Sequence, residues 1–205
     1  MTTSYPAALQ QAIDALALLP GVGPRSAERY ATYLLKSDPQ VTQTIVSALA
    51  NLHDNVKTCP KTFTLISADA AEDPLYSDAA REKTSVIVVE NPLDIYIFEQ
   101  TNSYKGTYHV LGGSLSPLDG ITPDRLKIPE LLSRILEDQV SEIIIATNPT
   151  VEGESTAIFL NNLLRDAYPS LTITRLARGL SLGLDIAYTD SMSLGLALAN
   201  RTPIE

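Results

Sequence analysis

Residues 19–25, Leu-Pro-Gly-Val-Gly-Pro-Arg, restrict the fold of this chain more than any other segment. Two glycines and two prolines within five positions cannot continue a helix, so residues 20–24 must form a turn. Apolar residues at helical spacing predict one helix over residues 7–19, before the turn, and another over residues 26–36, after it. A third amphipathic helix is predicted over residues 40–53.

This turn has a specific chemical use. Gly21 and Gly23 carry no Cβ, so the backbone can approach a phosphate closely. The helix that begins near Pro24 directs its free N–H groups and positive dipole end toward the same anion. Arg25 and Arg29 lie four positions apart on one face of that helix and add positive charge. We therefore expect a helix-hairpin-helix that binds the DNA backbone. In the alternative, the glycines serve packing alone and the chain is an interaction scaffold.

The charge of the chain bears on this expectation. A net charge of −9 over 205 residues argues against a nucleic-acid partner. Residues 1–37, however, hold three basic and two acidic residues, so the acidic excess lies elsewhere. One such segment would bind DNA weakly, and several copies in an oligomer would bind more tightly through avidity. No apolar run approaches eighteen residues and no basic-then-apolar leader is present, which favours a soluble cytoplasmic protein without a membrane partner.

The pattern changes near residue 85, after an irregular, acidic stretch at 54–83 that is typical of a linker or a small satellite module. Short β-branched runs then alternate with amphipathic segments, which predicts an α/β fold with a parallel sheet. The predicted strands are residues 86–89, 107–111, 142–146 and 171–175, and the predicted helices are residues 92–100, 126–137 and 153–166.

Acidic residues follow two of the predicted strands. Glu90 ends the first, and Asn-Pro-Thr-Val-Glu-Gly-Glu at 148–154 follows the third, where parallel sheets place their ligands. These segments resemble the Toprim fold of topoisomerases, primases and small nucleases. Its catalytic members hold Mg²⁺ with a Glu and an Asp-x-Asp pair. Here Asn148 and Thr150 occupy the Asp-x-Asp positions. Glu152 and Glu154 leave room for weak Mg²⁺ binding, but hydrolytic chemistry is not expected.

Other catalytic motifs are weaker. His53 and His109 stand apart from any Ser or Cys motif, so we expect each to be structural or exposed. The glycine-rich segment at 112–114 lacks the lysine of a P-loop. Cys59 is the single cysteine, which excludes an internal disulfide and a multi-cysteine metal site, and we expect it to be a bystander in a polar loop.

The hairpin and the altered Toprim segments together resemble the RecR family of bacterial recombination mediators over nearly the whole length. The segments that carry the resemblance are residues 19–29, 88–96, 115–120, 146–154, 178–183, 188–190 and 199–201. The resemblance implies a non-catalytic ring, a homotetramer or dimer with its hairpins facing a channel. It also implies action with RecO and RecF in loading RecA at gapped or single-stranded/double-stranded DNA. Gly21, Gly23, Arg25 and Arg29 match the DNA-contacting hairpin, and Glu90, Glu152 and Glu154 match a RecO contact surface.

Two departures from the family follow. The family has a four-cysteine zinc module between hairpin and Toprim, whereas residues 54–83 contain only Cys59. We therefore predict no zinc and no other cofactor, and a module that folds by other contacts or stays loosely ordered. Ala187 stands where the family commonly has an acid, so nucleotide hydrolysis is unsupported. The predicted organisation is a helix-hairpin-helix region at 1–53, the zinc-free module at 54–83, a Toprim domain at 84–175 and a C-terminal segment at 176–205. A metal-dependent Toprim nuclease or primase-like enzyme is the alternative.

Overall fold

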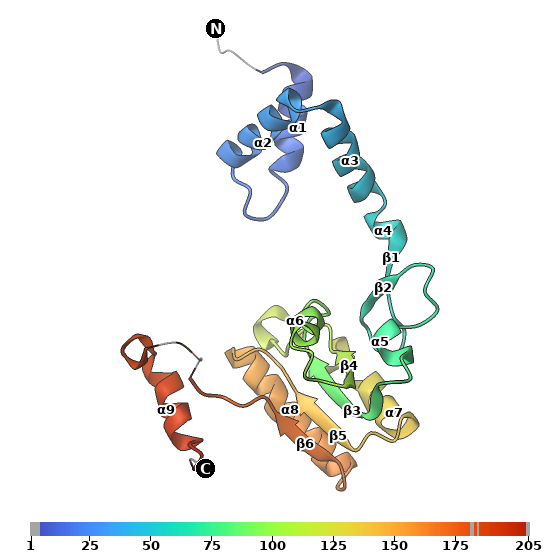
Figure 1. The fold of residues 1–205 in the computed structure, drawn as a ribbon, viewed down its shortest axis with the longest axis vertical. Helices are drawn as coiled ribbons and strands as arrows, with labels where there is room; N and C mark the ends of the chain where they lie inside the picture. Colours follow the sequence, from blue (N-terminus) through green and yellow to red (C-terminus); the bar gives the residue numbers. More distant parts are fainter. Residues whose placement is uncertain (1–4, 181–182, 184, 204–205) are drawn as a thin grey trace. The chain divides into compact units, whose positions relative to one another are not determined.

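The computed structural model describes residues 5–180, 183 and 185–203. The chain divides into two compact units, residues 1–56 and 57–205, and each is described on its own (Figure 1).

The first unit is helical. It consists of α1 (Ala7–Leu16), α2 (Pro24–Lys36), α3 (Pro39–Ala50) and the single turn α4 (Leu52–Asn55). Helices α1 and α2 pack through a small core in which Ile13, Ala27 and Ala31 are buried. The predicted extension of the first helix to residue 19 is wrong, since α1 ends at Leu16 and Leu18 lies in the turn with 84% of its surface exposed. Pro20 disfavours helical geometry at Leu19. The Leu18 and Leu19 N–H groups donate to the Ala15 and Leu16 carbonyls three residues back, which closes the helix in a tighter turn.

Helix α3 leaves its apolar face uncovered. The Asp38 carboxylate caps its first turn by accepting from the Gln40 N–H at 2.9 Å. None of its residues is buried. Val46 and Leu49, which belong to its apolar stripe, are more than half exposed. Among the residues that the structure describes, this apolar stripe stays exposed, so it is available for an intermolecular contact.

The second unit contains a four-stranded sheet. Its strands are β3 (Glu82–Val89), β4 (Gly106–Val110), β5 (Glu142–Ile145) and β6 (Thr172–Arg175), in the order β4-β3-β5-β6. All three pairings are parallel. The predicted α/β fold with a parallel sheet is confirmed, and the strand boundaries differ from the expected ones mainly at β3, which begins earlier at Glu82.

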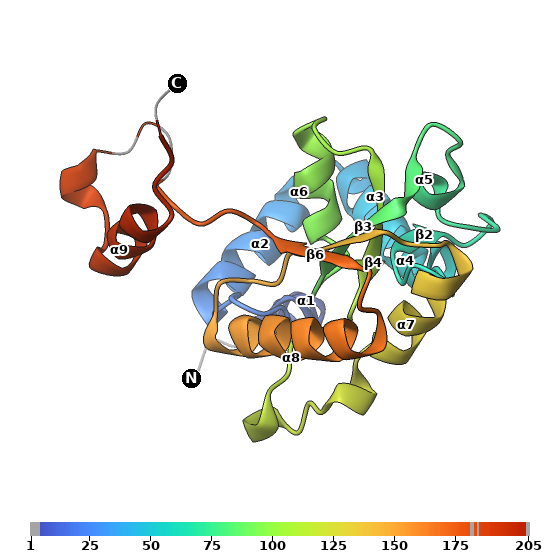
Figure 2. The same cartoon turned by 90° about the horizontal axis from the view of Figure 1, so that it is seen from below.

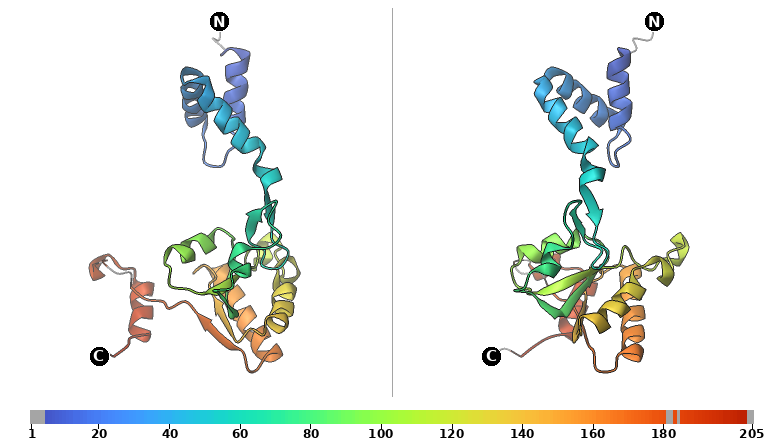
Figure 3. Two further views of the ribbon diagram at one scale, coloured as in Figure 1. Left: turned by 45° about the vertical axis from the view of Figure 1, so that its right-hand side comes forward. Right: turned by 90° about the vertical axis from the view of Figure 1, so that its right-hand side faces the viewer.

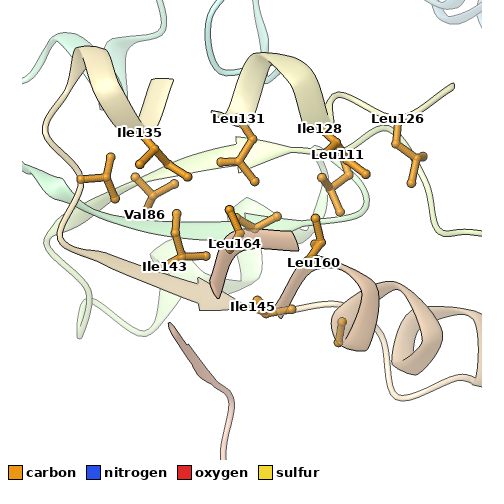
Figure 4. Packing of buried hydrophobic residues seen from close by; sticks show 13 residues of the cluster. Val86, Leu111, Leu126, Ile128, Leu131, Ile135, Ile143, Ile145, Leu160 and Leu164 are labelled. Atoms are coloured by element: carbon orange, nitrogen blue, oxygen red, sulfur yellow. The ribbon is translucent and has the colours of Figure 1, made fainter. Parts of the chain in front are cut away.

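Helices pack on both faces of this sheet and bury β4 and the carboxyl half of β3, whereas edge strand β6 has no buried residue. On one face α7 (Ile128–Glu137) and α8 (Val151–Ala167) pack on the central strands (Figure 2). Figure 4 shows this core, with Val86 and Ile143 of the strands opposite Leu131 and Leu164 of the helices. On the other face Ile95 of α6 (Asp94–Gln100) packs against Ile87, Val89 and Val110.

The segment between hairpin and sheet is ordered, which corrects the expectation of an irregular stretch. It forms β1 (Val56–Thr58), β2 (Leu65–Ser67) and the single turn α5 (Pro74–Ser77) (Figure 3). Strands β1 and β2 pair with each other, and the Val110 N–H of edge strand β4 donates to the Thr62 carbonyl at 2.9 Å. Residues 57–83 therefore belong to the second unit.

Cys59 lies inside the fold and not in the open polar loop that the sequence suggested. It is fully buried, together with Thr62, Thr64 and Asp73. The Thr62 hydroxyl donates to the Asp73 carboxylate at 3.0 Å and lies 2.8 Å from the Thr64 hydroxyl. Burial raises the pKa of the Cys59 thiol, but hydrogen bonds from Thr62 and from the backbone N–H groups of Lys61 and Asp73 leave this pKa below its ordinary value. Internal hydrogen bonds thus organise the region where the family has its zinc module.

A second polar cluster fastens this module to α7. The Asp138 carboxylate accepts from Tyr76 at 2.7 Å, from Lys61 at 3.0 Å and from Arg134 Nε at 3.0 Å. Arg134 is 2% exposed and also donates to the Thr107 hydroxyl at 2.6 Å. One carboxylate therefore joins the module, α7 and, through Arg134, strand β4.

The C-terminal segment follows β6. It contains the 3-10 turn η3 (Ile186–Tyr188) and the apolar helix α9 (Ser191–Ala199), which has no buried residue. Two further 3-10 turns, η1 (Pro117–Asp119) and η2 (Pro123–Arg125), precede α7. Within the described residues, no helix combines the length and the apolarity needed to span a membrane.

Candidate nucleic-acid interface and Toprim edge

The hairpin between α1 and α2 has a geometry suited to a phosphate. Gly21 adopts φ +77°, a left-handed conformation that favours glycine. Gly23 adopts φ −76°, and a Cβ at this position would meet no atom within 4 Å. The fold therefore leaves space for a side chain at position 23, whereas close approach of an external group would exclude one.

The start of α2 presents donors and charge beside this turn. Pro24 occupies the first helical position, and Gly23 is the N-cap. The N–H groups of Ser26 and Ala27 donate to the Gly23 carbonyl, while no acceptor is found within the described residues for the Arg25 N–H. The Arg25 and Arg29 side chains are exposed, and neither forms an ion pair with a described acid. All four predicted DNA-binding residues thus lie on one exposed hairpin.

At the carboxyl end of the sheet, Glu90 faces inward. It is 8% exposed, and its two oxygens accept from the Asn148 backbone N–H at 2.9 Å and from the Asn148 side-chain amide at 2.7 Å. Asn148 stands at the first Asp-x-Asp position and donates two hydrogen bonds where a second carboxylate would repel Glu90. Glu90 therefore fixes the loop after β5 and is not a surface side chain.

The second altered position has a structural role as well. The Thr150 hydroxyl caps α8 by accepting from the Gly153 N–H at 3.1 Å. A Cβ on Gly153 would lie 2.1 Å from the Asn148 carbonyl oxygen and 2.7 Å from Glu90 Oε1. The loop, the cap and Glu90 consequently pack so closely that only glycine fits at position 153.

The two remaining predicted acids differ from each other. Glu154 binds Arg175 through two hydrogen bonds, at 3.0 and 2.8 Å, and also pairs with Arg178. Glu152 is exposed and has no ion pair within the described part of the chain. Sequence reasoning missed both arginines, because they follow Glu154 by 21 and 24 residues and no local pattern links them. Of the three acids, Glu152 presents a free carboxylate, while Glu154 anchors the start of the C-terminal segment.

Neither the acids nor the buried histidine form a recognisable metal site. Over residues 5–180, 183 and 185–203, no three His, Cys, Asp or Glu side chains are grouped as metal ligands. The four-ligand set of a zinc module does not fit the residues around Cys59, whose neighbours are hydroxyls and Asp73 held in internal hydrogen bonds. The absence of zinc and weak Mg²⁺ binding stay predictions.

His109, which we expected to be either structural or exposed, lies inside the fold. It is fully buried in β4, and its Nε2 lies 2.8 Å from the Lys127 carbonyl. That carbonyl can only accept, so Nε2 carries the proton and Nδ1 is left without a partner within the described residues. Burial, helped by the nearby charge of Arg134, lowers the pKa of His109 to about 4, against the opposing effect of the Lys127 carbonyl. His53 lies exposed in α4.

A helix-hairpin-helix followed by a Toprim fold defines a class of proteins that act on DNA. Comparison with protein families agrees with this assignment: the family described as "RecR, helix-hairpin-helix" matches residues 9–53, and the Toprim domain family matches residues 84–177.

Relatives extend the match over nearly the full length. The chain is 42% identical to "Recombination protein RecR" of Saccharopolyspora erythraea over 203 residues, which cover 98% of this chain and 100% of the relative. It is 44% identical to the protein of that name from Rhodococcus jostii, covering 96% of this chain and 98% of the relative. It is 45% identical to that of Mycobacterium tuberculosis, covering 94% and 96%. The chain belongs to the RecR family, whose members are DNA-binding recombination mediators.

Proposed function

We propose that the chain mediates recombinational repair as a non-catalytic oligomeric clamp in the cytoplasm, acting with RecO and RecF to load RecA at gapped DNA. The observation that carries the DNA-binding part is the exposed hairpin. At Gly23 the fold leaves open space where a side chain would stand, and Arg25 and Arg29 form no ion pair with a described acid. This arrangement fits a phosphate between the backbone of the turn and the two guanidinium groups.

Self-association is supported by apolar surface that the chain leaves uncovered. Both α3 and α9 are apolar helices without a buried residue in the described structure. Covering them with a second copy would remove this surface from water. It would also bring several hairpins onto one DNA molecule, which compensates for the weak charge of a single hairpin by avidity.

Docking of RecO at the Toprim edge remains part of the proposal, with a narrower residue set. Glu152 is the exposed acid among the three, so it suits direct contact with a basic partner surface. Glu90 and Glu154 support it by holding the loop and the C-terminal segment. No zinc, Mg²⁺ or other cofactor is needed for these roles, and metal analysis of the purified protein should find well under one zinc per chain.

The test is binding to gapped DNA at a stated salt concentration, by fluorescence anisotropy, for the double variant Arg25→Ala, Arg29→Ala. We expect loss of binding of at least about 10-fold and a salt dependence weaker by about two phosphate contacts. Light scattering should give an oligomeric mass for both proteins. Undiminished binding by the double variant would refute the hairpin's role, and a monomeric mass with and without gapped DNA would refute the clamp.

A separate cleavage assay tests the alternative that the chain is a metal-dependent Toprim enzyme. Gapped and supercoiled DNA incubated with Mg²⁺ or Mn²⁺ should remain intact, because the Asn148 amide and the Thr150 hydroxyl replace the two carboxylates that catalytic Toprim proteins use. Cleavage by the chain that disappears in Glu90→Gln would establish the alternative instead.

A further inference from the structure

A groove in the second unit lies between the zinc-free module and α6, the helix after β3. Its volume is about 330 Å³, and the residues that form it come from segments 64–75 and 92–99. Its main apolar walls are Leu65, Pro74, Leu75, Ile95 and Tyr96. We call it the α5–α6 groove, after the two helices that border it (Figure 1).

The groove leaves large apolar side chains in contact with solvent. Ile95 is buried at its base, whereas 39% of Leu65 and 55% of Tyr96 are exposed. Beside Tyr96 on α6, Leu93 and Ile97 are exposed by 59% and 66%. A hollow with apolar walls and further apolar side chains at its border is typical of a surface that a partner covers.

The segments that border the groove are also acidic. Segments 69–78 and 90–99 contain seven acids and no lysine or arginine. Asp73 and Glu90 are buried in internal hydrogen bonds, and Glu99 pairs with Arg81. The exposed acids are therefore Asp69, Glu72 and Asp78, on the side of residues 57–83. This surface repels a phosphate backbone and attracts a cationic partner.

The walls of the groove are held before any partner arrives. The Asp73 carboxylate accepts from the Thr62 hydroxyl at 3.0 Å and from the Leu75 N–H at 3.0 Å, which fixes the start of α5. Glu99 accepts from Tyr108 at 2.6 Å and from Arg81 at 3.0 Å, which fixes the end of α6. A groove whose walls are already fixed loses little conformational entropy on binding.

We propose that the α5–α6 groove docks a basic, apolar segment of a partner protein. Apolar side chains of that segment would pack on Leu65 and Tyr96, and its Lys or Arg residues would face the acidic borders. The proposal rests on the proposed function, in which the chain works through protein partners. It adds a docking surface distinct from the free Glu152 at the start of α8.

The variants change the groove at exposed positions. Tyr96→Lys places a positive charge on the apolar wall, where it would repel the basic partner segment. Its matched control is Leu118→Lys, at a residue of η1 that is 99% exposed. Glu72→Lys reverses a charge at the border, and its matched control is Asp166→Lys, another exposed acid outside the groove. Circular dichroism and thermal melting of all four full-length variants verify that they fold.

Purified RecO and RecF from the same organism are the first probes, titrated in biolayer interferometry at two salt concentrations. We expect at least one to bind the wild type and to lose about 10-fold or more in affinity for Tyr96→Lys and Glu72→Lys, with the two controls changed by less than about 2-fold. Binding that the groove variants retain, or that the controls lose equally, overturns the groove and leaves the proposed function standing.

A synthetic peptide of alternating lysine and leucine is the second probe, compared with a peptide in which serine replaces every leucine. We expect the wild type to prefer the leucine peptide and Tyr96→Lys to lose that preference. If neither RecO nor RecF binds the wild type, the partner element of the proposed function fails, and the peptides decide the groove alone. Equal binding of the two peptides by the wild type overturns it.

Discussion

Removing the Asp138 carboxylate should strongly destabilise the second unit. This carboxylate is 6% exposed and accepts hydrogen bonds from Lys61, Tyr76 and Arg134. In Asp138→Ala, the Arg134 guanidinium stays buried, with 1% of its side chain exposed, and its charge is no longer compensated.

The magnitude follows from that buried charge. Three hydrogen bonds to a charged acceptor contribute about 1.5–3 kcal/mol each. Their sum is only an upper limit on the lost unfolding free energy, because all three share one carboxylate. Breaking a buried ion pair by removing one partner costs about 3–5 kcal/mol, and we expect Asp138→Ala to lose this amount of unfolding free energy. Glu137→Ala is the matched control. Glu137 is 61% exposed and lies 3.3 Å from the same Lys61, so its loss should cost no more than about 1 kcal/mol.

Urea denaturation of the full-length proteins, followed by far-ultraviolet circular dichroism, measures both values. A loss for Asp138→Ala that is no larger than that for Glu137→Ala would refute the assignment of this cluster as the attachment of residues 57–83 to α7. The pH dependence gives a second measurement. Burial raises the pKa of Asp138, but hydrogen bonds from Tyr76, Lys61 and Arg134 leave it below the ordinary 3.8. Its contribution is therefore present above about pH 4 and is lost as the pH falls through the folded-state pKa, a loss that Asp138→Asn should not show.

Three further changes test other parts of the structure. Gly23→Ala should cost no more than about 1 kcal/mol of stability, the cost of alanine at an N-cap, because the added Cβ meets no atom of the fold. It should nevertheless weaken DNA binding by about 10-fold in anisotropy, and unchanged binding would contradict close phosphate approach. Glu154→Gln should lower the oligomer mass at moderate salt, because it weakens the contacts with Arg175 and Arg178 that hold the start of the C-terminal segment. Glu152→Gln should leave this mass unchanged, and equal masses for the two variants in light scattering would contradict the role of Glu154. The ring protons of His109 should show no titration by NMR above about pH 5.5, and a titration midpoint near 6.5 would contradict its burial. The free energy of unfolding should decline by roughly 3 kcal/mol between pH 6.5 and 4, because His109 takes up its proton at higher pH in the unfolded chain than in the folded one.

The sequence was sufficient for the sheet and for the hairpin, for different physical reasons. Runs such as residues 86–89 are β-branched and buried on both faces, so their composition alone identifies the strands of a parallel sheet. In the hairpin, glycine and proline restrict the backbone locally, and the turn needs no distant contact to form. The expected first helix is too long because apolar periodicity continues into Leu18 and Leu19, whereas the backbone there forms a tighter turn that leads into Pro20.

The ordered module at 57–83 could not be predicted by periodicity. Its strands have three residues and its helix four, which is too short for a repeating pattern. One signal was available: Asp73 followed by Pro74 is a typical helix start, and Asp73 does cap α5. The burial of Cys59 and the attachment through Asp138 depend on contacts between residues far apart in the chain, which a single sequence does not reveal.

The same reasoning explains why the candidate site changed most between sequence and structure. A row of acids near the strand ends suggests a negative surface, but the free charge depends on which residues the fold brings beside each acid. Glu90 meets the Asn148 amide, and Glu154 meets two arginines, so each acid is used inside the chain. In a metal-dependent Toprim protein the acids must remain free to bind a cation, and the cation offsets their repulsion. Here internal donors offset the repulsion for Glu90 and Glu154, so the shape of this edge is set by hydrogen bonds and ion pairs within the chain.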